Sequence, residues 1–234
     1  LKNEVKFLTG QVNYASTELL DNDQFILKEK KDKQFCEAIS NQNISIESLI
    51  NNLESMKNCR MMVIGDTIID QYSACEAIGV SAEAPVIVVK ELGTKNFLGG
   101  AAIVASHIKA LGAEPILISL IGNDEIGNKT IKDLDKIGVE NILIKDQNRP
   151  TTLKKRYCVE NQKVFRVSKL EDKSVSTEIE EKIINALEKN AKDCNGIIVS
   201  DFVYGLITPK IISFIKKVSK KYNLFVFGDL QCSS

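Results

Sequence analysis

The stretch LGGAAIVASHIKALGAEPILISLIGNDEIG, residues 98–127, contains the pattern that decides the fold. Its apolar residues first recur at helical spacing and then stop at Gly112, where the end of a helix favours a residue with positive φ. A continuous apolar run, Ile116–Ile121, follows directly and has the length and the branched residues of a buried strand. A helix that leads into a buried strand is half of a β-α-β unit, so these residues predict an α/β domain.

The same alternation runs from Arg60 to the end of the chain. Its amphipathic helices have readable ends, such as the capping-box spacing of Thr177 and Glu180 and the helix start at Thr208–Pro209. The pattern predicts a mostly parallel sheet with flanking helices. The expected strands are Met61–Ile64, Ile116–Ile121, Ile142–Ile144, Ile197–Ser200 and Leu224–Phe227.

Two regions interrupt the alternation with strand-like runs that no helix separates. They are Pro85–Lys90 and the pair Thr151–Tyr157 and Lys163–Val167. We expect antiparallel pieces beside the main sheet, and a small β lid over a site is their natural use.

Composition excludes several classes of function. Thirty-one basic residues balance 31 acidic ones, so nucleic acid is not expected as a partner. No apolar stretch approaches the roughly 20 residues of a membrane helix and no signal peptide is evident, which predicts a cytoplasmic chain with no membrane partner. The 6 cysteines are scattered without a CxxC pair, so reduced structural thiols are expected rather than a zinc or redox site. Histidine-dependent sites such as the Ser-His-Asp triad are incomplete, because the only histidine, His107, lies inside an apolar helical run and is expected to be structural.

The strands VIGD, IIVSD and VFGD end at Asp66, Asp201 and Asp229. The carboxyl ends of parallel strands share one edge of the sheet, so these aspartates should face a common space, with Asp70 one turn further along. Each aspartate taken alone can equally cap the next helix or turn. Together they would repel one another unless hydroxyl donors or a cation compensate, which points to a sugar or to Mg²⁺.

Gly99 and Gly100 stand just before the helix expected at Ala101, where a ligand can approach the backbone and the free N–H groups of the first turn. The pair belongs neither to a P-loop nor to a GxGxxG fingerprint. Asp124, in the GNDEIG sequence after Ile121, is as readily an N-cap as a ligand.

Basic residues gather on the strand-like runs after Pro150, and surface charge is their ordinary explanation. Arg156 and Arg166 can alternatively face a phosphate from the lid. The set comprises Lys154, Lys155, Arg156 and Arg166.

Five motifs stand in series: VIGDTIIDQY (63–72), SAEAPVIVVK (81–90), LGGAAIVASHIKALGA (98–113), IGNDEIG (121–127) and SDFVYGLIT (200–208). In order and spacing they resemble the N-terminal part of the ribokinase/PfkB carbohydrate kinases. The likeness is strongest to the heptose-7-phosphate kinase branch used in ADP-heptose synthesis. It covers about Arg60 to Ser234.

The resemblance implies a ribokinase-like fold and the ATP- and Mg²⁺-dependent phosphorylation of a sugar hydroxyl. It implies that Asp70, which matches the second aspartate of the family's GDxxxD motif, holds sugar hydroxyls together with Gly99 and Gly100. Asp66 and Asp201 would line the same cleft, and a small sugar or sugar phosphate is the expected partner.

The resemblance also identifies the lid and two departures from the family pattern. The Ala84–Lys90 strand, with Val86 and Val88, would belong to the lid, where a homodimer would also form. Ile103 stands where the family has the asparagine of GGAAN, and Tyr204 stands where the heptose kinases have the lysine of DYxKG. These departures motivate an alternative, a non-catalytic sugar-binding or scaffold module derived from the fold. A Rossmann-type dinucleotide enzyme is a third hypothesis, weakened by the absent GxGxxG.

The family's second signature, GAGD, does not occur in the 234 residues. In the family it forms the anion hole and supplies the general-base aspartate. We therefore expect the catalytic base and the ATP site to lie beyond Ser234, so that residues 59–234 are the N-terminal part of a kinase domain, incomplete at the C-terminus. On this hypothesis the chain alone binds no ATP or Mg²⁺ and has no kinase activity.

Residues 1–58 differ in composition from the rest of the chain, because they are rich in Asn, Gln, Ser and charged residues. Their clearest element is a helix after Ser45, a residue suited to cap it. Phe7–Asp21 resembles the tail of the cytidylyltransferase-like domain fused ahead of some PfkB proteins, in which Ser16 and Thr17 would match residues that meet the nucleotide. A polar loop before a helix explains the same residues equally well. The segment is thus expected to be the tail of a nucleotidyltransferase-like domain plus a helical linker.

Overall fold

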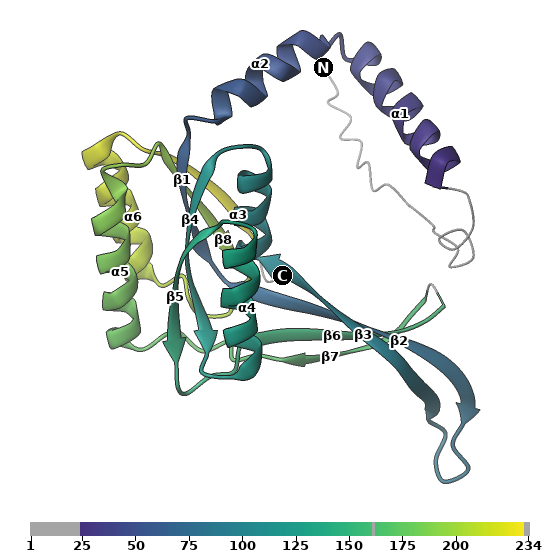
Figure 1. Cartoon of the computed structure of the whole chain (residues 1–234). Coiled ribbons are helices and arrows are strands. Elements are labelled where there is room, and N and C mark those ends of the chain that lie inside the picture. The colour runs from purple at the N-terminus through teal and green to yellow at the C-terminus, as the bar shows by residue number, and fades with distance from the viewer. Residues whose placement is uncertain (1–23, 161, 232–234) are drawn as a thin grey trace, which may run out of the picture.

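The computed structural model describes residues 24–160 and 162–231. The Phe7–Asp21 segment, with Ser16 and Thr17, lies outside the described residues. Figure 1 shows a layered α/β domain from which a second, narrow sheet extends to one side. The α/β architecture predicted from the apolar periodicity is confirmed.

The main sheet has five strands in the order β5-β4-β1-β8-β9, and all its pairs are parallel. The central strand β1 pairs with β4 on one side and β8 on the other, so the carboxyl ends of these three strands meet at one edge. Every apolar run that predicted a strand of the main sheet matches one of its strands, although β9 begins at Phe225, one residue after the predicted start at Leu224. These are β1 (Arg60–Gly65), β4 (Glu114–Gly122), β5 (Glu140–Asp146), β8 (Gly196–Asp201) and β9 (Phe225–Leu230).

Helices cover both faces of this sheet, as its apolar strands require. Val63 of β1 packs with Leu134 on one face, whereas Met62 and Ile64 pack with Ile183 on the other. Alternate residues of one strand thus belong to two separate hydrophobic clusters. The first face is covered by α3 (Ala101–Ala110) and α4 (Glu125–Lys136), and the second by α5 (Thr177–Ala191) and α6 (Pro209–Tyr222).

The second sheet has four strands in the order β3-β2-β6-β7, and we call it the lid. The hairpins β2–β3 and β6–β7 are antiparallel, as expected, but β2 and β6 pair in parallel. The prediction that Asp70 lies one turn beyond Asp66 was wrong, because β2 begins at Thr67 and Asp70 lies inside this strand. The strands are β2 (Thr67–Val80), β3 (Ile87–Gly100), β6 (Thr152–Val159) and β7 (Gln162–Lys169).

Most predicted helix ends are confirmed. Gly112 and Gly138 follow α3 and α4 with φ values of 94° and 72°, conformations that glycine adopts without strain. Thr208 caps α6, and its hydroxyl accepts a hydrogen bond from the N–H of Ile211 at 3.2 Å.

The predicted capping box of α5 was wrong by one residue. Ser176 is the N-cap, and its hydroxyl accepts a hydrogen bond from the N–H of Ile179 at 3.4 Å. Thr177 is already the first helical residue. Glu180 does not reach back to the cap, because its carboxylate pairs with Thr208 and, at 3.0 Å, with Lys210 of α6.

Two helices precede the domain and lie apart from both sheets (Figure 1). In α2 (Ile46–Met56) the predicted cap is confirmed, since the Ser45 hydroxyl accepts a hydrogen bond from the N–H of Ser48 at 3.0 Å. α1 (Gln24–Asn41) was not expected from its charged sequence. α2 buries none of its residues, which agrees with a connecting role. Within the described part of the chain, no helix is long and apolar enough to cross a membrane.

The edge strand β9 is exposed along its whole length. Phe225 and Phe227 are 71% and 57% exposed, and Val226 and Leu230 are also open to solvent. One side of β9 pairs with β8, so its other edge presents unpaired backbone groups beside apolar side chains.

Candidate functional site

Asp66 lies at the carboxyl edge of the main sheet, directly after β1. Its side chain is buried, and Oδ2 accepts hydrogen bonds from the N–H groups of Phe202 (2.8 Å) and Tyr204 (3.3 Å). Its own N–H donates to the carbonyl of Ser200 at 3.1 Å, and its carbonyl accepts from the N–H of Ala101 at 2.9 Å. Burial raises the pKa of the Asp66 carboxyl, although the two N–H donors act in the opposite direction. Asp66 therefore joins β1, the turn after β8 and the start of α3.

Asp70 lies on β2 in the lid, and its carboxylate pairs through Oδ1 with Nη1 of Arg156 on β6. The Arg156 guanidinium also lies over the ring of Tyr72, 5.3 Å from the ring centroid. The second carboxylate oxygen, Oδ2, faces Gly99, where an added Cβ would lie only 2.6 Å away. The missing side chain at Gly99 thus leaves room for the Asp70 carboxylate, whose Oδ2 occupies the space that a Cβ would take.

Gly100 is the N-cap of α3, and its φ of 56° with ψ −139° is a conformation that is essentially restricted to glycine. A Cβ at this position would lie 2.1 Å from the carbonyl oxygen of Asp66. The structure therefore brings Asp66, Asp70 and both glycines together, as the sequence analysis expected. The N–H of Ala101, at the start of α3, is not free for a ligand because it donates to the Asp66 carbonyl.

The turn after β8 places Asp201 and two aromatic rings at the same edge. Oδ1 of Asp201 accepts the N–H of Val203 at 2.8 Å, which is the turn-capping role weighed as the alternative. The Nζ of Lys154, from β6 of the lid, lies 5.3 Å from the ring centroid of Phe202 and 5.2 Å from that of Tyr204. A lid lysine thus contacts the ring at the position where the heptose kinases carry a lysine of their own.

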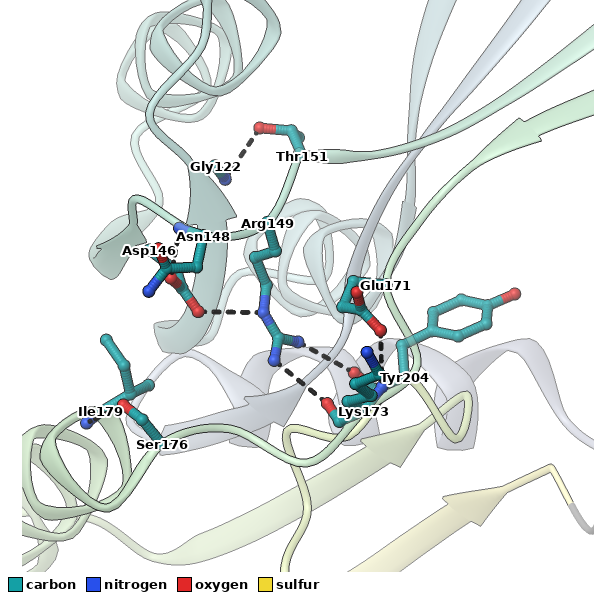
Figure 2. Close-up of polar contacts among 10 residues, drawn as sticks. All are labelled: Gly122, Asp146, Asn148, Arg149, Thr151, Glu171, Lys173, Ser176, Ile179 and Tyr204. Atoms are coloured by element: carbon teal, nitrogen blue, oxygen red, sulfur yellow. Dashed lines mark hydrogen bonds and ion pairs between the residues drawn. The ribbon is translucent and has the colours of Figure 1, made fainter.

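Arg149 is a residue of this edge that the sequence analysis did not identify (Figure 2). Its Nε donates to Oδ2 of Asp146 at 3.0 Å, Nη1 to the carbonyl of Tyr204 at 3.1 Å, and Nη2 to the carbonyl of Lys173 at 3.0 Å. Two of the three acceptors are backbone carbonyls distant in the sequence, which no residue pattern reveals. The only sequence signal was the Asp146–Arg149 spacing in the loop after β5.

Asp124 is the N-cap of α4, which confirms one of the two roles considered for it. Oδ1 accepts the N–H of Gly127 at 2.8 Å and the hydroxyl of Thr151 at 2.7 Å, and Oδ2 accepts the N–H of Thr151 at 2.9 Å. The Thr151 hydroxyl also accepts the N–H of Gly122 at 3.0 Å. Asp124 thus anchors the point at which the chain enters β6 of the lid.

Among the remaining candidates, the two lid valines lie far from this cluster, whereas Asp229 pairs in register with Ser200 at the same edge of the main sheet. Val88 lies on β3 and Val86 in the turn before it. At about 3.3 Å per residue, Val88 is about 30 Å along β3 from Phe97, the residue that pairs with Asp70. Arg166 is exposed opposite Arg156 in the β6–β7 pair, and Asp229 is exposed on β9. His107, which was expected to be structural, lies on α3 and is exposed.

Ile103 lines a cavity of about 490 Å³ between the lid, α3 and α4. Apolar side chains such as Ile69 and Leu98 form much of its wall, and Lys129 and Asp133 of α4 are polar members. Asp66, Asp70 and Asp201 do not belong to its lining. The cavity is therefore separate from the acidic cluster.

The described residues do not fit a metal centre or a disulfide. They contain no group of three or more His, Cys, Asp or Glu side chains that could hold an ion, and Asp66 and Asp70 are occupied by N–H donors and Arg156. No Mg²⁺-dependent chemical step is therefore assigned to these residues. All five described cysteines are free, and burial raises the pKa of the Cys194 thiol to about 11.

Comparison with known proteins gives a consistent result. The chain is 31% identical over 175 residues to the bifunctional protein HldE of Campylobacter jejuni subsp. doylei, covering 75% of this chain and 36% of that protein. It is 36% identical over 180 residues to HldE of Helicobacter hepaticus, covering 76% of this chain and 37% of that protein. The chain thus spans about a third of the length of these curated relatives.

Solved structures share the fold. Phosphofructokinase-2 from Escherichia coli in complex with fructose-6-phosphate has a TM-score of 0.57 at 12% identity, covering 75% of this chain and 56% of that chain. Ribokinase from Giardia lamblia has a TM-score of 0.55 at 12% identity, with the same coverage. The family described as pfkB family carbohydrate kinase matches residues 59–193. The chain belongs to the pfkB family of carbohydrate kinases.

Proposed function

We propose that residues 59–234 are the sugar-binding part of an ATP-dependent sugar kinase whose substrate is a sugar phosphate of the heptose-phosphate class. The observation that carries this proposal is the position of the Asp70 carboxylate, which lies beside the backbone of Gly99 and pairs with Arg156. A carboxylate accepts hydrogen bonds from sugar hydroxyls, and a glycine lets a sugar ring approach the backbone.

The cations of the lid support a phosphorylated substrate. Arg156 pairs with Asp70 through Nη1, and a guanidinium has further N–H donors directed elsewhere. Lys154 contacts two aromatic rings and, among the described residues, forms no ion pair with a carboxylate. An arginine fork and a lysine point charge together suit a phosphate group.

We further propose that ATP, Mg²⁺ and the general base come from residues outside this chain, because the chain contains no GAGD sequence. These groups would supply in-line phosphoryl transfer, in which positioning and charge stabilisation provide most of the rate. The 234 residues alone should then bind the sugar phosphate without sugar-dependent ATP turnover.

The test is Asp70→Asn in the full-length protein, with the sugar phosphate titrated in a coupled kinase assay and by calorimetry. We expect the KM for the sugar to rise about tenfold or more, as loss of a charge-assisted hydrogen bond predicts. Asp135→Asn on α4 is the matched control and should leave the KM unchanged, since the exposed Asp135 carboxylate accepts a hydrogen bond from Asn141 and lies outside both the cavity and the acidic cluster. Unchanged kinetics in D70N would reject the role of Asp70.

The same titration separates the kinase from a non-catalytic module. Binding of the sugar phosphate by the full-length protein without turnover would favour the module, which Ile103 and Tyr204 motivate. Binding with turnover would support the kinase. Absence of any binding would reject both proposals for this site.

We also propose that two copies of the protein associate through the lid. The free end of the β2–β3 hairpin exposes Ile78, Val80 and Ile87 by 62%, 69% and 65%. Burying these side chains against a second copy would remove apolar surface from water. Val80→Lys should shift the full-length protein towards monomer in analytical ultracentrifugation, and an unchanged sedimentation profile would count against this interface.

Residues 1–58 are proposed to be the tail of a nucleotidyltransferase-like domain plus a helical linker to the kinase part. The support is that α2 buries none of its residues and lies apart from the sheets (Figure 1). Limited proteolysis of the full-length protein should therefore cut between residues 41 and 59 and release a protected kinase part. Protection of this segment in the full-length protein would reject the linker role.

A further inference from the structure

Arg149 lies where the second lid hairpin leaves the main domain and close to where it returns. The hairpin consists of β6, which begins at Thr152, and β7, which ends at Lys169. The Arg149 side chain is only 10% exposed, so its guanidinium is held inside the domain rather than in solvent.

The three nitrogens of the Arg149 guanidinium donate hydrogen bonds to three different segments of the chain (Figure 2). Nε binds Asp146 at the end of β5, Nη2 binds the carbonyl of Lys173 after β7, and Nη1 binds the carbonyl of Tyr204 in the turn after β8. All three distances lie between 3.0 and 3.1 Å. A planar fork of fixed donors suits this arrangement, and a lysine ammonium cannot reproduce it.

The segments that Arg149 joins also touch one another. A Cβ at Gly205 would lie 2.0 Å from the carbonyl oxygen of Lys173, and the N–H of Val175 donates to the carbonyl of Gly205 at 2.9 Å. Asp146 is fixed in turn, because its Oδ1 accepts the N–H of Asn148 at 2.8 Å. The exit of the hairpin is therefore packed against the turn after β8, and Arg149 closes this junction.

The hairpin carries the two lid cations of the candidate site, Lys154 and Arg156. The Lys154 ammonium contacts the rings of Phe202 and Tyr204, which belong to the turn that Arg149 binds. A shift of the hairpin relative to this turn would separate Lys154 from the rings of Phe202 and Tyr204. The contacts of Arg149 thus help to fix Lys154 relative to the turn whose N–H groups bind Asp66.

We propose that Arg149 is a positioning residue that holds the β6–β7 hairpin against the turn after β8 and thereby sets the affinity for the sugar phosphate. The effect on affinity rests on the proposed function, which supplies the substrate. The hold of Arg149 on the β6–β7 hairpin does not depend on that function. Arg149 also acts on the neighbouring carboxylate, since its charge favours the ionised form of Asp66.

The experiment compares Arg149→Met and Arg149→Lys in the full-length protein, with hydrogen exchange of the lid amides and steady-state kinetics as readouts. In R149M we expect amides of β6 and β7 to exchange about tenfold faster or more while the strands of the main sheet keep their protection. The KM for the sugar phosphate should rise about tenfold and kcat should change less, because substrate positioning is lost before chemistry. R149K should recover only part of both effects.

Arg60→Met is the matched control. Arg60 also pairs with a carboxylate, that of Glu140 at 2.7 Å, but at the start of β1, on the opposite edge of the same sheet. R60M should leave the exchange of the hairpin and the KM unchanged. Asp146→Asn is a milder second variant, because it removes the charge that Arg149 pairs with but keeps both carbonyl contacts of Arg149. It should show the same effects at smaller size even if R149M does not fold.

The outcomes separate the two proposals. If the wild-type protein binds no sugar phosphate, the proposed function fails, and the exchange data alone decide whether Arg149 holds the hairpin. Faster hairpin exchange with an unchanged KM would overturn the role of Arg149 in affinity. Unchanged hydrogen exchange of the hairpin in both R149M and D146N would show that Arg149 does not hold the hairpin in place.

Discussion

Gly100 has no substitute among the common amino acids, because two independent constraints meet at its α-carbon. Its φ of 56° with ψ −139° is strained for any L side chain, and a Cβ would overlap the carbonyl oxygen of Asp66 at 2.1 Å. We expect Gly100→Ala to lower the free energy of unfolding by at least about 2 kcal/mol, measured by urea denaturation.

Gly93 is the control for this substitution because it lies in the same strand. A Cβ at Gly93 would meet nothing within 4 Å. Gly93→Ala should therefore change stability by no more than about 0.5 kcal/mol. Equal stabilities of the two variants would contradict the conformation assigned to Gly100.

Asp66 should impose a pH dependence on stability that differs in sign from that of most carboxylates. Burial raises its pKa in the folded protein above the ordinary value of 3.8, so the folded state binds the proton more tightly than the unfolded state does. Its contribution to stability is fully present below that value and is lost as the pH rises through the folded pKa. Asp66→Asn should remove this loss, seen as a flatter curve of unfolding free energy against pH.

Asp124 provides the comparison of opposite sign. Burial acts to raise its pKa, but the hydrogen bonds from Thr151 and Gly127 outweigh it, and the pKa is lowered overall. Its contribution is therefore present above the ordinary pKa and is lost as the pH falls. Asp124→Asn should make the protein less stable near neutrality, and a D66N curve with the same sign as the D124N curve would refute the raised pKa of Asp66.

The candidate site was only partly predictable at the level of single residues. Strand-end aspartates and a glycine pair are visible in the sequence because the topology of a parallel sheet brings them to one edge. Arg149 was not visible, because it binds backbone carbonyls, and any residue type can supply a carbonyl. The contact of Lys154 with Tyr204 depends on how the lid folds back over the main sheet, which sequence spacing does not specify.

At the scale of elements, the start of α5 offers a direct test of the corrected cap. Ser176→Ala should cost about 1 kcal/mol of stability, because its hydroxyl accepts the N–H of Ile179. Thr177→Ala should cost less than about 0.5 kcal/mol, since Thr177 already lies inside the helix. Thermal or urea unfolding of both variants measures the difference, and a larger loss for T177A would restore the capping box.

Helices and buried strands were predicted well because their signals are local. The strands of the main sheet are continuous apolar runs, and Gly112 and Gly138 mark helix ends by backbone conformation alone. β2 was missed because most of its outer half is exposed, so its side chains show no clear alternation. Its pairing with β3 and β6 is decided by tertiary contacts.

At the scale of the whole molecule, β9 should control the association of the 234-residue chain. The strand presents Phe225 and Phe227 beside an unpaired edge, a combination that templates pairing with another chain. We expect concentration-dependent association in light scattering, reduced by Phe227→Lys. Leu111→Lys, at an exposed apolar residue after α3, is the control and should not reduce association. A chain that stays monomeric at all concentrations would contradict this role of the edge.

The aromatic contacts of the lid cations have an optical consequence. The chain has 5 tyrosines and no tryptophan, so its near-ultraviolet signal comes chiefly from tyrosine. Tyr72 lies under Arg156, Tyr204 lies under Lys154, and Tyr157 stacks on Phe165 within the lid. Three tyrosines thus sit in or against the lid, so any change in the distance between hairpin and turn should alter the absorption and circular dichroism of the unlabelled protein.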